Sequence, residues 1–416
     1  MNTVIFLTTS YPYGSGEEFI ENEIEILANK FDKVVLIATE VDPNARTMRE
    51  LPNNTISLRI NREEGSVAKL GSLFVMIGLY LSGKAYKGDF KSKRKYYERK
   101  FILRMEERSW RIWNKIKKSR VLDDIKIDKI TIYSYWLLLT ARVGVFIKEQ
   151  SGLQIKRMIS RAHGYDLYEE RSVVGFLPYR KLFLREYDII ATCSQNGAVY
   201  LSEFCERELR EKKENIYTGY LGTCDYGVKE TNTSDILYLV SCSSLIPLKR
   251  VERIANTLLL LDKTCQIYWT HIGDGPTRAL IDQRIEALPS NIKVNLAGTL
   301  SNQEVMEFYR NAPIDLFINV SSTEGVPVSI MEALSFGIPV IATNVGGVSE
   351  MIQDGKNGYL LRCDFTDSEL AELITKFMSM KKKEQYVSFR KNARETWERQ
   401  FNAQVNYNEF WDRNRG

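Results

Sequence analysis

Two glutamates, Glu324 and Glu332, stand eight residues apart with a Gly-Val-Pro-Val sequence directly after the first. On a single helix their side chains would lie about 12 Å apart, which is too far to share a proton or a metal ion. Each carboxylate can, however, accept hydrogen bonds from its own pair of neighbouring hydroxyl groups. The spacing therefore indicates that the two side chains hold two ends of one extended ligand.

The sequence between the two carboxylates can bind an anion. Gly325 permits a tight turn or a close approach of the backbone to a ligand, and Pro327 is favourable near a helix start. The free amides of Val326, Val328 and Ser329 would then lie at the positive end of the helix dipole, which suits a phosphate. A ligand with a central diphosphate, a sugar at one end and a ribose at the other would use all of these groups. The alternative is that both glutamates only face solvent on a helix.

The residues around this pair match a known family pattern. The sequence STEGVPVSIMEALSFGIPVIATNVGGVSEMI, which begins at Ser322, resembles the donor-site signature of retaining glycosyltransferase family 4, a family with the GT-B fold. That signature has a Glu-x7-Glu pair, then a Gly-Xaa-Pro-Val-Ile strand and a Gly-Gly turn. The resemblance is detailed over residues 236–362 and looser over the first half of the chain. It implies that Glu324 contacts hydroxyls of a donated sugar, that Glu332 holds the donor ribose, and that the amides from Gly325 to Val328 meet the sugar and the phosphates.

A second stretch, Ser241 to Val251, resembles the family's other phosphate-binding element. The match implies that Lys249 neutralises the donor diphosphate. Ser244 stands where the family usually has arginine, so one cation is missing, and Arg250 is the candidate to supply it. The other interpretation is that Lys249 and Arg250 only begin a helix in water.

Three glycines match family positions near the ligand. Gly273, in a Gly-Asp-Gly-Pro turn after a strand, is expected near the nucleotide base, and Gly298 is expected to expose its backbone there. Gly16, in a Gly-Ser-Gly sequence after the first strand, is expected near the phosphates and the acceptor. The sequences around Gly273 and Gly16 also fit plain turns that bind nothing. Gly346 and Gly347 are expected to serve close packing more than ligand contact.

The chain has two histidines, which excludes any site that needs three. His163 begins a His-Gly sequence after a strand and resembles the family histidine that approaches the donor sugar from the first domain. We expect its imidazole to be neutral or nearly so at cytoplasmic pH, and to hydrogen-bond the sugar or steady developing charge. A purely structural role is the alternative. His271 lies inside an apolar strand, which predicts a buried structural residue.

The sequence predicts neither a metal site nor a bound cofactor. No Asp-x-Asp occurs in the chain, so paired carboxylates that would hold a divalent ion on a diphosphate are missing. The negative charge of the leaving group would then be neutralised by Lys249, by Arg250 and by the helix start. The six cysteines form no Cys-x-x-Cys pair, which is typical of reduced thiols in a cytoplasmic protein.

Short apolar strands alternate with helices along the chain, which predicts parallel sheets covered on both faces. In the first half, strands are expected at 4–8, 33–38, 130–133, 158–162 and 189–194. After a polar linker, strands are expected at 236–242, 265–272, 292–297, 315–320, 338–343 and 358–361, and helices at 250–262, 277–288, 302–311, 328–336, 347–352, 367–379 and 383–398. In doubly wound sheets ligands bind beyond the carboxyl ends of the strands, which is where the paired glutamates stand.

The expected fold class is therefore α/β of the GT-B type, with two doubly wound parallel-sheet domains facing each other across a cleft. An acceptor-side domain is expected over residues 1–225 and a nucleotide-sugar-binding domain over residues 226–399. Residues 400–416 are expected to form a helix that crosses back to the first domain.

Basic charge is concentrated between Lys84 and Arg120, which include 15 Lys and Arg but 4 Asp and Glu. This local balance of +11 leaves −6 for the rest of a chain whose net charge is +5. One helical face of this stretch carries apolar side chains, namely Tyr97, Phe101, Met105, Ile112 and Ile116. With the apolar run Leu70–Leu81, residues 70–120 fit an element that lies on an anionic membrane surface. They fit equally a surface helix that packs its apolar face on its own domain.

Two other classes of function are not expected from the basic stretch. The apolar run is a dozen residues long, whereas a membrane-spanning helix needs about 20. The charge is confined to one segment without a recognition module, so nucleic-acid binding is not expected.

The expected function is a retaining hexosyltransferase that uses a nucleoside-diphosphate sugar, UDP-linked, and a saccharide acceptor. The acceptor is expected to be lipid-linked, in capsule, exopolysaccharide or lipopolysaccharide synthesis, with the enzyme in the cytoplasm or peripheral on the inner membrane face. A nucleotide-sugar 2-epimerase of the same fold is one alternative, although it would need further acid and base groups. A non-catalytic saccharide-binding partner protein is the other, and the presence of Glu324, Glu332 and Lys249 argues against it.

Overall fold

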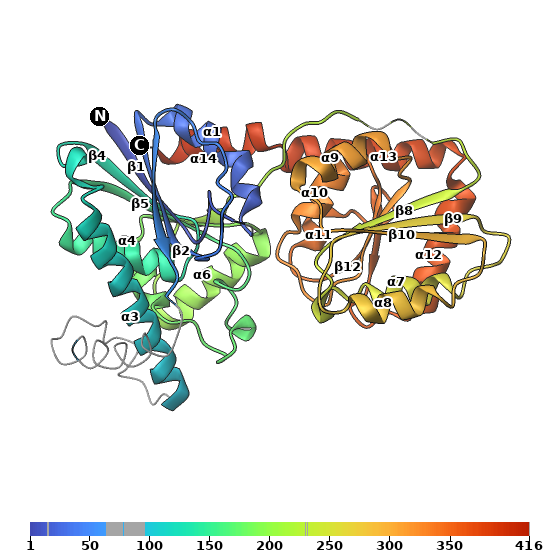
Figure 1. Ribbon diagram of the computed structural model, residues 1–416, viewed down its shortest axis with the longest axis horizontal. Coiled ribbons are helices and arrows are strands. Elements are labelled where there is room, and N and C mark those ends of the chain that lie inside the picture. The colour runs from blue at the N-terminus through green and yellow to red at the C-terminus, as the bar shows by residue number, and fades with distance from the viewer. Residues whose placement is uncertain (15, 64–77, 79–95, 229, 231, 416) are drawn as a thin grey trace. The chain divides into compact units, whose positions relative to one another are not determined.

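The computed structural model describes residues 1–14, 16–63, 78, 96–228, 230 and 232–415. The chain forms two compact units, shown in Figure 1. The first comprises Met1–Gly219 with Tyr407–Gly416, and the second comprises Tyr220–Asn406. The sequence predicted the unit boundaries at 225/226 and 399/400, whereas in the structure they lie at 219/220 and 406/407. The apolar run expected at 70–81 lies outside the described residues except for Gly78, and so do residues 84–95 of the basic stretch.

The first unit contains a parallel sheet with the strand order β3-β2-β1-β4-β5-β6-β7. Its strands are β1 (Asn2–Thr8), β2 (Lys33–Val41), β3 (Thr55–Asn61), β4 (Lys129–Ser134), β5 (Ile155–Ala162), β6 (Ile189–Thr192) and β7 (Ile216–Thr218). Its helices are α1 (Glu21–Lys30), α3 (Tyr96–Ser119), α4 (Leu139–Gln150), α5 (Arg180–Glu186) and α6 (Gln195–Leu209), joined by the part of α14 (Ala403–Asn414) from Tyr407 onward.

Both faces of this sheet are buried, as the alternation of strands and helices predicts. Successive side chains of a strand point to opposite faces, so Ile5 and Leu7 of β1 join the apolar core on the side of α3 and α4. Phe6, between them, stacks on Tyr133 at 4.8 Å, and Tyr133 contacts Trp411 of α14 at 4.9 Å. The last helix thus supplies part of the second face.

The second unit contains a parallel sheet with the strand order β10-β9-β8-β11-β12-β13. Its strands are β8 (Leu237–Cys242), β9 (Ile267–Ile272), β10 (Ile292–Gly298), β11 (Leu316–Asn319), β12 (Val340–Thr343) and β13 (Gly358–Leu361). Its helices are α7 (Glu252–Leu258), α8 (Arg278–Ile285), α9 (Asn302–Asn311), α10 (Val328–Ser335), α11 (Val348–Met351), α12 (Asp367–Met380) and α13 (Glu384–Gln400). All six strands and seven helices expected here from the sequence are present, although α7 is shorter than expected.

Both sheets reverse their winding direction at one place. In the first unit this switch point lies between β1 and β4, and in the second it lies between β8 and β11. The loops that leave the carboxyl ends of two such strands diverge, and the crevice between them is where ligands bind in folds of this type. The fold therefore marks two loop pairs, one in each unit, as places for a site.

The described part of the basic stretch packs its apolar face on its own unit. Met105, Ile112 and Ile116 of α3 are buried in the core of the first unit, and Phe101 is partly buried against it. Among the basic residues of α3, Lys115 pairs with Glu63 at 2.8 Å and Arg108 pairs with Glu40. For residues 96–119 the structure therefore favours a surface helix that packs its apolar face on its own domain. Of the apolar residues predicted to share that face, only Tyr97 is exposed.

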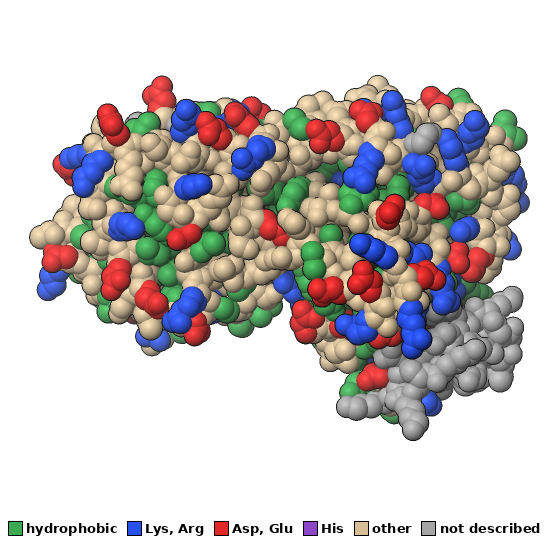
Figure 2. Space-filling model, turned by 180° about the vertical axis from the view of Figure 1, so that it is seen from behind, with side chains coloured by type: hydrophobic (Ala, Val, Ile, Leu, Met, Phe, Trp, Pro, Cys, Tyr) green, Lys and Arg blue, Asp and Glu red, His purple; other side chains and the backbone are tan. Residues whose placement is uncertain are grey.

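Charge on the surface is mixed. Basic and acidic side chains are interspersed over the face drawn in Figure 2. Among the described residues, no helix combines the length and the apolar character that crossing a bilayer requires.

Candidate functional site

The switch point of the second unit joins two loops, one after β8 and one after β11. The amide and hydroxyl of Ser322 both donate to the carbonyl oxygen of Leu248, at 2.8 and 3.1 Å. Leu248 directly precedes Lys249, and Ser322 lies two residues before Glu324. The two loops are therefore held side by side, and each carries one of the residues that the sequence singled out.

Lys249 and Glu324 meet across these loops. The Lys249 ammonium lies 2.7 Å from Glu324 Oε1, and the side-chain amide of Asn319, at the end of β11, donates to the same oxygen at 3.2 Å. The carboxylate is buried, whereas the lysine side chain is 25 % exposed. The pair thus has one face enclosed by protein and a cation that remains accessible. The structure brings together two residues that are 75 positions apart in the chain.

The start of α10 lies directly after Glu324. Pro327 is its N-cap, with extended backbone angles, and the helix begins at Val328, as expected from the sequence. The amides of Val328 and Ser329 hydrogen-bond to no backbone or side-chain acceptor among the described residues, as is usual for the first turn of a helix. Val326 is largely buried. The positive helix end, the Lys249 ammonium and a carboxylate therefore occur together, which suits a ligand that carries both phosphate and hydroxyl groups.

Glu332 is buried one turn further along α10. Its side chain is 6 % exposed, and the side-chain amide of Asn302, at the start of α9, donates to its Oε1 at 2.7 Å. Burial raises the pKa of the Glu332 carboxyl to about 7, and the Asn302 hydrogen bond only partly offsets this effect. Glu332 is therefore a carboxyl that changes its charge near neutral pH, unlike a solvent-facing glutamate on a helix.

Arg250 braces the loops instead of facing solvent. Its backbone is in the left-handed region, with a φ of 50°. Its guanidinium donates to the carbonyl oxygens of Val320 and Cys363, both at 2.8 Å, and of Ser321 at 3.2 Å. The suggestion that Arg250 supplies the missing cation gains no support from this geometry, because these donors already bind the protein's own backbone. Ser244, at the position of the missing arginine, is exposed.

The glycines of the second unit differ in how much space surrounds them. A side chain at Gly273 would lie 2.0 Å from the carbonyl oxygen of Ser243, and one at Gly346 would lie 1.9 Å from that of Glu324. Close packing of Gly346, expected from the sequence, is confirmed. Gly298 has a φ of 73°, and its carbonyl oxygen accepts the Gly273 amide at 2.7 Å. A side chain at Gly325, in contrast, would meet no atom within 4 Å.

Two alanine substitutions separate packing from ligand contact in this loop. Gly346→Ala should lower the free energy of unfolding by about 2 kcal/mol or more, because the position has a φ of 57° and its new methyl group would collide with Glu324. Gly325→Ala should change it by less than about 1 kcal/mol but should weaken nucleotide-sugar binding, because the methyl group enters the open space. Urea unfolding and calorimetric titration measure both effects. Equal stability losses for the two variants, or unchanged binding by Gly325→Ala, would contradict this assignment.

His271 is structural, as its place in an apolar strand predicts. The imidazole is fully buried, with Nδ1 2.8 Å from the Ser241 hydroxyl and Nε2 3.1 Å from the carbonyl oxygen of Ser243. Because a carbonyl can only accept, Nε2 carries the proton and Nδ1 accepts from the hydroxyl. Burial lowers the pKa of His271 to about 4, so the ring is neutral.

His163 follows β5 at the carboxyl edge of the first sheet, as expected, but its charge differs from the expectation. Burial would lower the pKa of the imidazole, yet the sulfur of Cys193 and the carboxylate of Asp166 outweigh burial and raise that pKa to about 10. Nδ1 lies 3.7 Å from Asp166 Oδ2. The expectation of a neutral ring is therefore wrong, because these two groups are brought beside it by the fold. A protonated His163 can stabilise negative charge, and neither of its buried ring nitrogens hydrogen-bonds to another described residue.

Gly16 does not lie beside a free set of amides after β1. Its own amide donates to Glu18 at 2.9 Å, and the neighbouring Ser15 lies outside the described residues. The amides of Thr9, Ser10 and Tyr11, which directly follow β1, bind the carboxylate of Glu17 instead. The sequence did not predict a role for Glu17, Trp136 or Asp166. Trp136 stands at the carboxyl end of β4, and Asp166 stands at the carboxyl end of β5. Their positions directly after apolar strands were the available signal.

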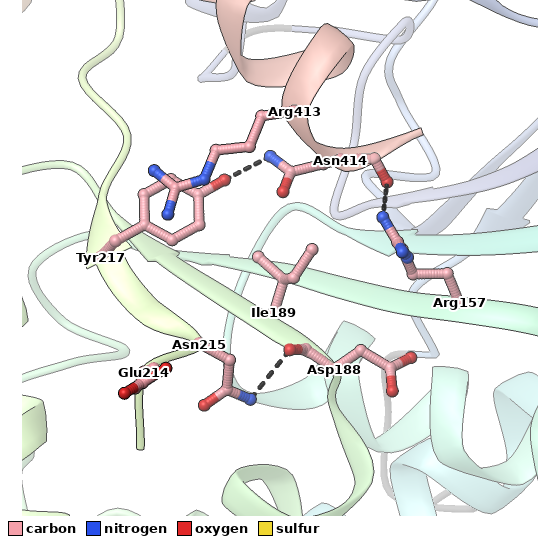
Figure 3. Close-up of a pocket in the computed structure, with 8 residues that line it drawn as sticks. All are labelled: Arg157, Asp188, Ile189, Glu214, Asn215, Tyr217, Arg413 and Asn414. Carbon is pink, nitrogen blue, oxygen red and sulfur yellow. Dashed lines mark hydrogen bonds between the residues drawn. The ribbon is translucent and has the colours of Figure 1, made fainter. Parts of the chain in front are cut away.

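The pocket drawn in Figure 3 lies at the other edge of the first sheet. It has a volume of about 260 Å³ and is placed where β6 and β7 begin. Arg157 donates to the carbonyl oxygen of Asn414 at 2.7 Å, and the Asn215 side chain donates to that of Asp188 at 2.8 Å. The first contact fastens the end of α14 to β5, and the second joins the residues that precede β7 and β6. None of the residues predicted for the site lines this pocket.

No set of three metal-binding side chains comes together within the described ranges of the chain. Within the second unit, the groups that could hold a charged ligand are the Lys249 ammonium and the first amides of α10.

Comparison with known proteins identifies a family that the second unit matches and a fold that the chain shares. Residues 228–396 match the family model for glycosyl transferases group 1. The N-acetyl-alpha-D-glucosaminyl L-malate synthase of Bacillus anthracis is 28 % identical over 180 residues, which are 43 % of this chain and 44 % of that protein. The alpha-monoglucosyldiacylglycerol synthase of Acholeplasma laidlawii is 34 % identical over 87 residues, 21 % of each chain. The chain thus spans less than half the length of each of these two relatives.

One solved structure extends the likeness to the whole chain. The Anabaena protein HepE, crystallised with UDP, superposes with a TM-score of 0.63 at 15 % identity and covers 99 % of both chains. At this identity the likeness concerns the fold alone. The chain therefore has the GT-B fold, and its second unit matches the glycosyl transferases group 1 family over residues 228–396.

Proposed function

We propose that this protein is a retaining glycosyltransferase that moves a hexose from a UDP-linked sugar to a saccharide acceptor. The observation that carries the proposal is the 2.7 Å contact between Lys249 and Glu324 beside the start of α10. The resemblance of the sequence to glycosyltransferase family 4 implies that Lys249 meets the donor diphosphate and that Glu324 meets the donated sugar.

Each part of the donor has a counterpart in the second unit. The diphosphate carries negative charge, which the Lys249 ammonium and the first amides of α10 would offset. Sugar hydroxyls would donate to Glu324 and ribose hydroxyls to Glu332, which is placed one turn along the same helix. A UDP-linked donor is favoured because HepE, which shares the fold, was crystallised with UDP.

The leaving UDP must be stabilised as the bond to the sugar breaks. We assign this role to Lys249 and the helix start, so transfer should not depend on a divalent ion. Groups that are already oriented toward developing charge stabilise it without further rearrangement. His163, as a cation of the first unit, is a further candidate for this role.

The acceptor is proposed to be lipid-linked, in the synthesis of a surface polysaccharide. One matched relative is named for a glycosylated diacylglycerol. Several cations of α3 are exposed, namely Arg99, Lys100, Arg104, Lys117 and Lys118. These side chains would suit a peripheral contact with the anionic inner membrane face, with the rest of the protein in the cytoplasm.

A panel of nucleotide-sugars tests the proposal. The donor should raise the unfolding temperature of the protein, and UDP should be released when an acceptor is added, with or without EDTA. Nuclear magnetic resonance of the product should show the anomeric configuration of the donor. A changed sugar from donor alone would instead identify an epimerase. Stabilisation by none of the nucleotide-sugars would overturn the proposal.

A further inference from the structure

The switch point of the first unit carries residues that the donor site does not use. Glu17 follows β1 and Trp136 follows β4, so the two residues stand on the diverging loops of that sheet. The Trp136 indole donates to Glu17 Oε1, which closes the gap between the loops. By the same rule that located the Lys249–Glu324 pair, this is where the first unit would take a ligand.

The ligand suited to this place is neutral. Glu17 is buried, and its carboxylate accepts the amides of Ser10 at 2.6 Å, Tyr11 at 2.7 Å and Thr9 at 3.1 Å. Three consecutive amides of this kind would otherwise form an anion site. Because the chain's own carboxylate fills it, these three amides are not free to bind a phosphate.

Two aromatic rings are presented at the same edge. Trp136 and Tyr165 lie 4.9 Å apart between ring centroids, with an angle of 35° between their planes. Trp136 is half-buried and Tyr165 is 49 % exposed. The Trp136 ring also lies 4.3 Å from the His163 ring between centroids, so most of the exposed aromatic surface of the pair belongs to Tyr165. Exposed apolar surface of this kind is uncommon unless it serves binding. Flat aromatic faces are suited to the C–H faces of a sugar ring, while their polar ends stay hydrated.

A second buried carboxylate fixes the position of this pair. Asp166 Oδ2 accepts the amide of Leu137 at 2.8 Å, and its Oδ1 accepts the amide of His163 at 2.7 Å. The loop that carries Trp136 is thereby joined to the loop that carries Tyr165. Since Glu17 holds the indole and Asp166 holds both loops, the two rings are ordered before any ligand arrives, which lowers the entropic cost of binding.

We infer that Trp136 and Tyr165 form a subsite for one neutral pyranose ring of the saccharide acceptor, with Glu17 as the residue that positions Trp136. The inference deepens the proposed function, and it depends on that function for the identification of the bound pyranose as part of the acceptor. The binding of the pyranose itself does not depend on that function.

Binding of methyl pyranosides to the full chain is the direct test. Saturation-transfer difference spectra with the methyl glycosides of glucose, galactose, mannose and N-acetylglucosamine should show at least one that binds through its ring protons. Tyr165→Ala and Trp136→Ala should each weaken that binding by about tenfold or more. Tyr96→Ala removes a tyrosine that is 80 % exposed on α3 and should change nothing. Because Tyr165 is exposed, its variant keeps the test valid even if Trp136→Ala fails to fold.

The positioning role of Glu17 has its own signature. Glu17→Gln removes the charge that holds the indole, so pyranoside affinity should fall. The fluorescence of Trp136, obtained as the difference from Trp136→Phe, should also shift. Inorganic phosphate should not compete with the pyranoside. Competition by phosphate, pyranoside binding that ignores both aromatic substitutions, or no pyranoside binding at all would overturn the inference. Stabilisation by nucleotide-sugars tests the proposed function separately, so either idea can fail alone.

Discussion

Lys249→Ala is expected to lower the rate of glycosyl transfer by about 100- to 1,000-fold, the range found when one group that stabilises developing charge is removed. Lys249 pairs with Glu324, four residues before α10 begins, and Arg250 beside it is engaged with backbone carbonyls. The measurement is kcat for UDP release with saturating donor and acceptor.

The structural effect of this change must be separated from the chemical one. Without Lys249, Glu324 keeps Asn319 as a hydrogen-bond partner but loses its ion pair. Glu324→Gln and the double variant complete a mutant cycle, in which unfolding in urea reports the stability term. Lys263→Ala, an exposed lysine before β9, is the matched control and should leave the rate unchanged. A Lys249→Ala enzyme that is folded and retains more than about a tenth of the activity would contradict the role of this cation.

Glu332→Gln is expected to stabilise the second unit at alkaline pH while it weakens donor binding. The pKa of Glu332 is about 7 in the folded protein and 4.5 in a solvated chain, and burial is the main cause. The folded state therefore holds the proton more tightly. The stability due to this proton is fully present below pH 4.5 and is lost as the pH rises through 7. A glutamine keeps the acceptor oxygen for Asn302 and has no charge to bury.

The sign and size of this effect follow from the pKa difference. At about pH 8.5 the substitution should raise the free energy of unfolding by roughly 3 kcal/mol, and at about pH 5 by less than roughly 1 kcal/mol. Donor affinity of the unsubstituted protein should rise between about pH 6 and pH 8, because only the ionised carboxylate is a full acceptor for two hydroxyls. Urea unfolding and calorimetric titration at both pH values measure these quantities.

A control isolates the contribution of burial at this position. Glu372→Gln changes an exposed glutamate of α12 and should alter neither stability nor donor binding at either pH. If Glu332→Gln stabilises the protein equally at both pH values, the buried carboxyl does not titrate as described. If donor binding is unaffected, Glu332 does not contact the donor. When a residue is retained for function at a cost in stability, its substitution usually raises stability and weakens binding.

Local sequence determined most of the architecture and the start of α10 beside Glu324. The alternation of apolar strands with helices in residues 236–398 predicted the elements of the second unit, because backbone periodicity is a local property. Pro327 predicted the start of α10, since proline at a helix start loses no hydrogen bond. The strands β3 and β7 were missed because both are edge strands, one half-exposed and the other three residues long.

Only the tertiary structure decided which groups meet and which charges they carry. The pairing of Lys249 with Glu324, the binding of Arg250 to three carbonyls and the contact of Trp136 with Glu17 all join loops from strands that are distant in the chain. The raised pKa values of Glu332 and His163 depend on burial and on neighbours brought in by the fold. Electrostatic interactions act through space, whereas periodicity and capping act along the chain. The sequence could therefore single out candidate residues such as Lys249, Glu324 and Glu332, but not their partners or their protonation.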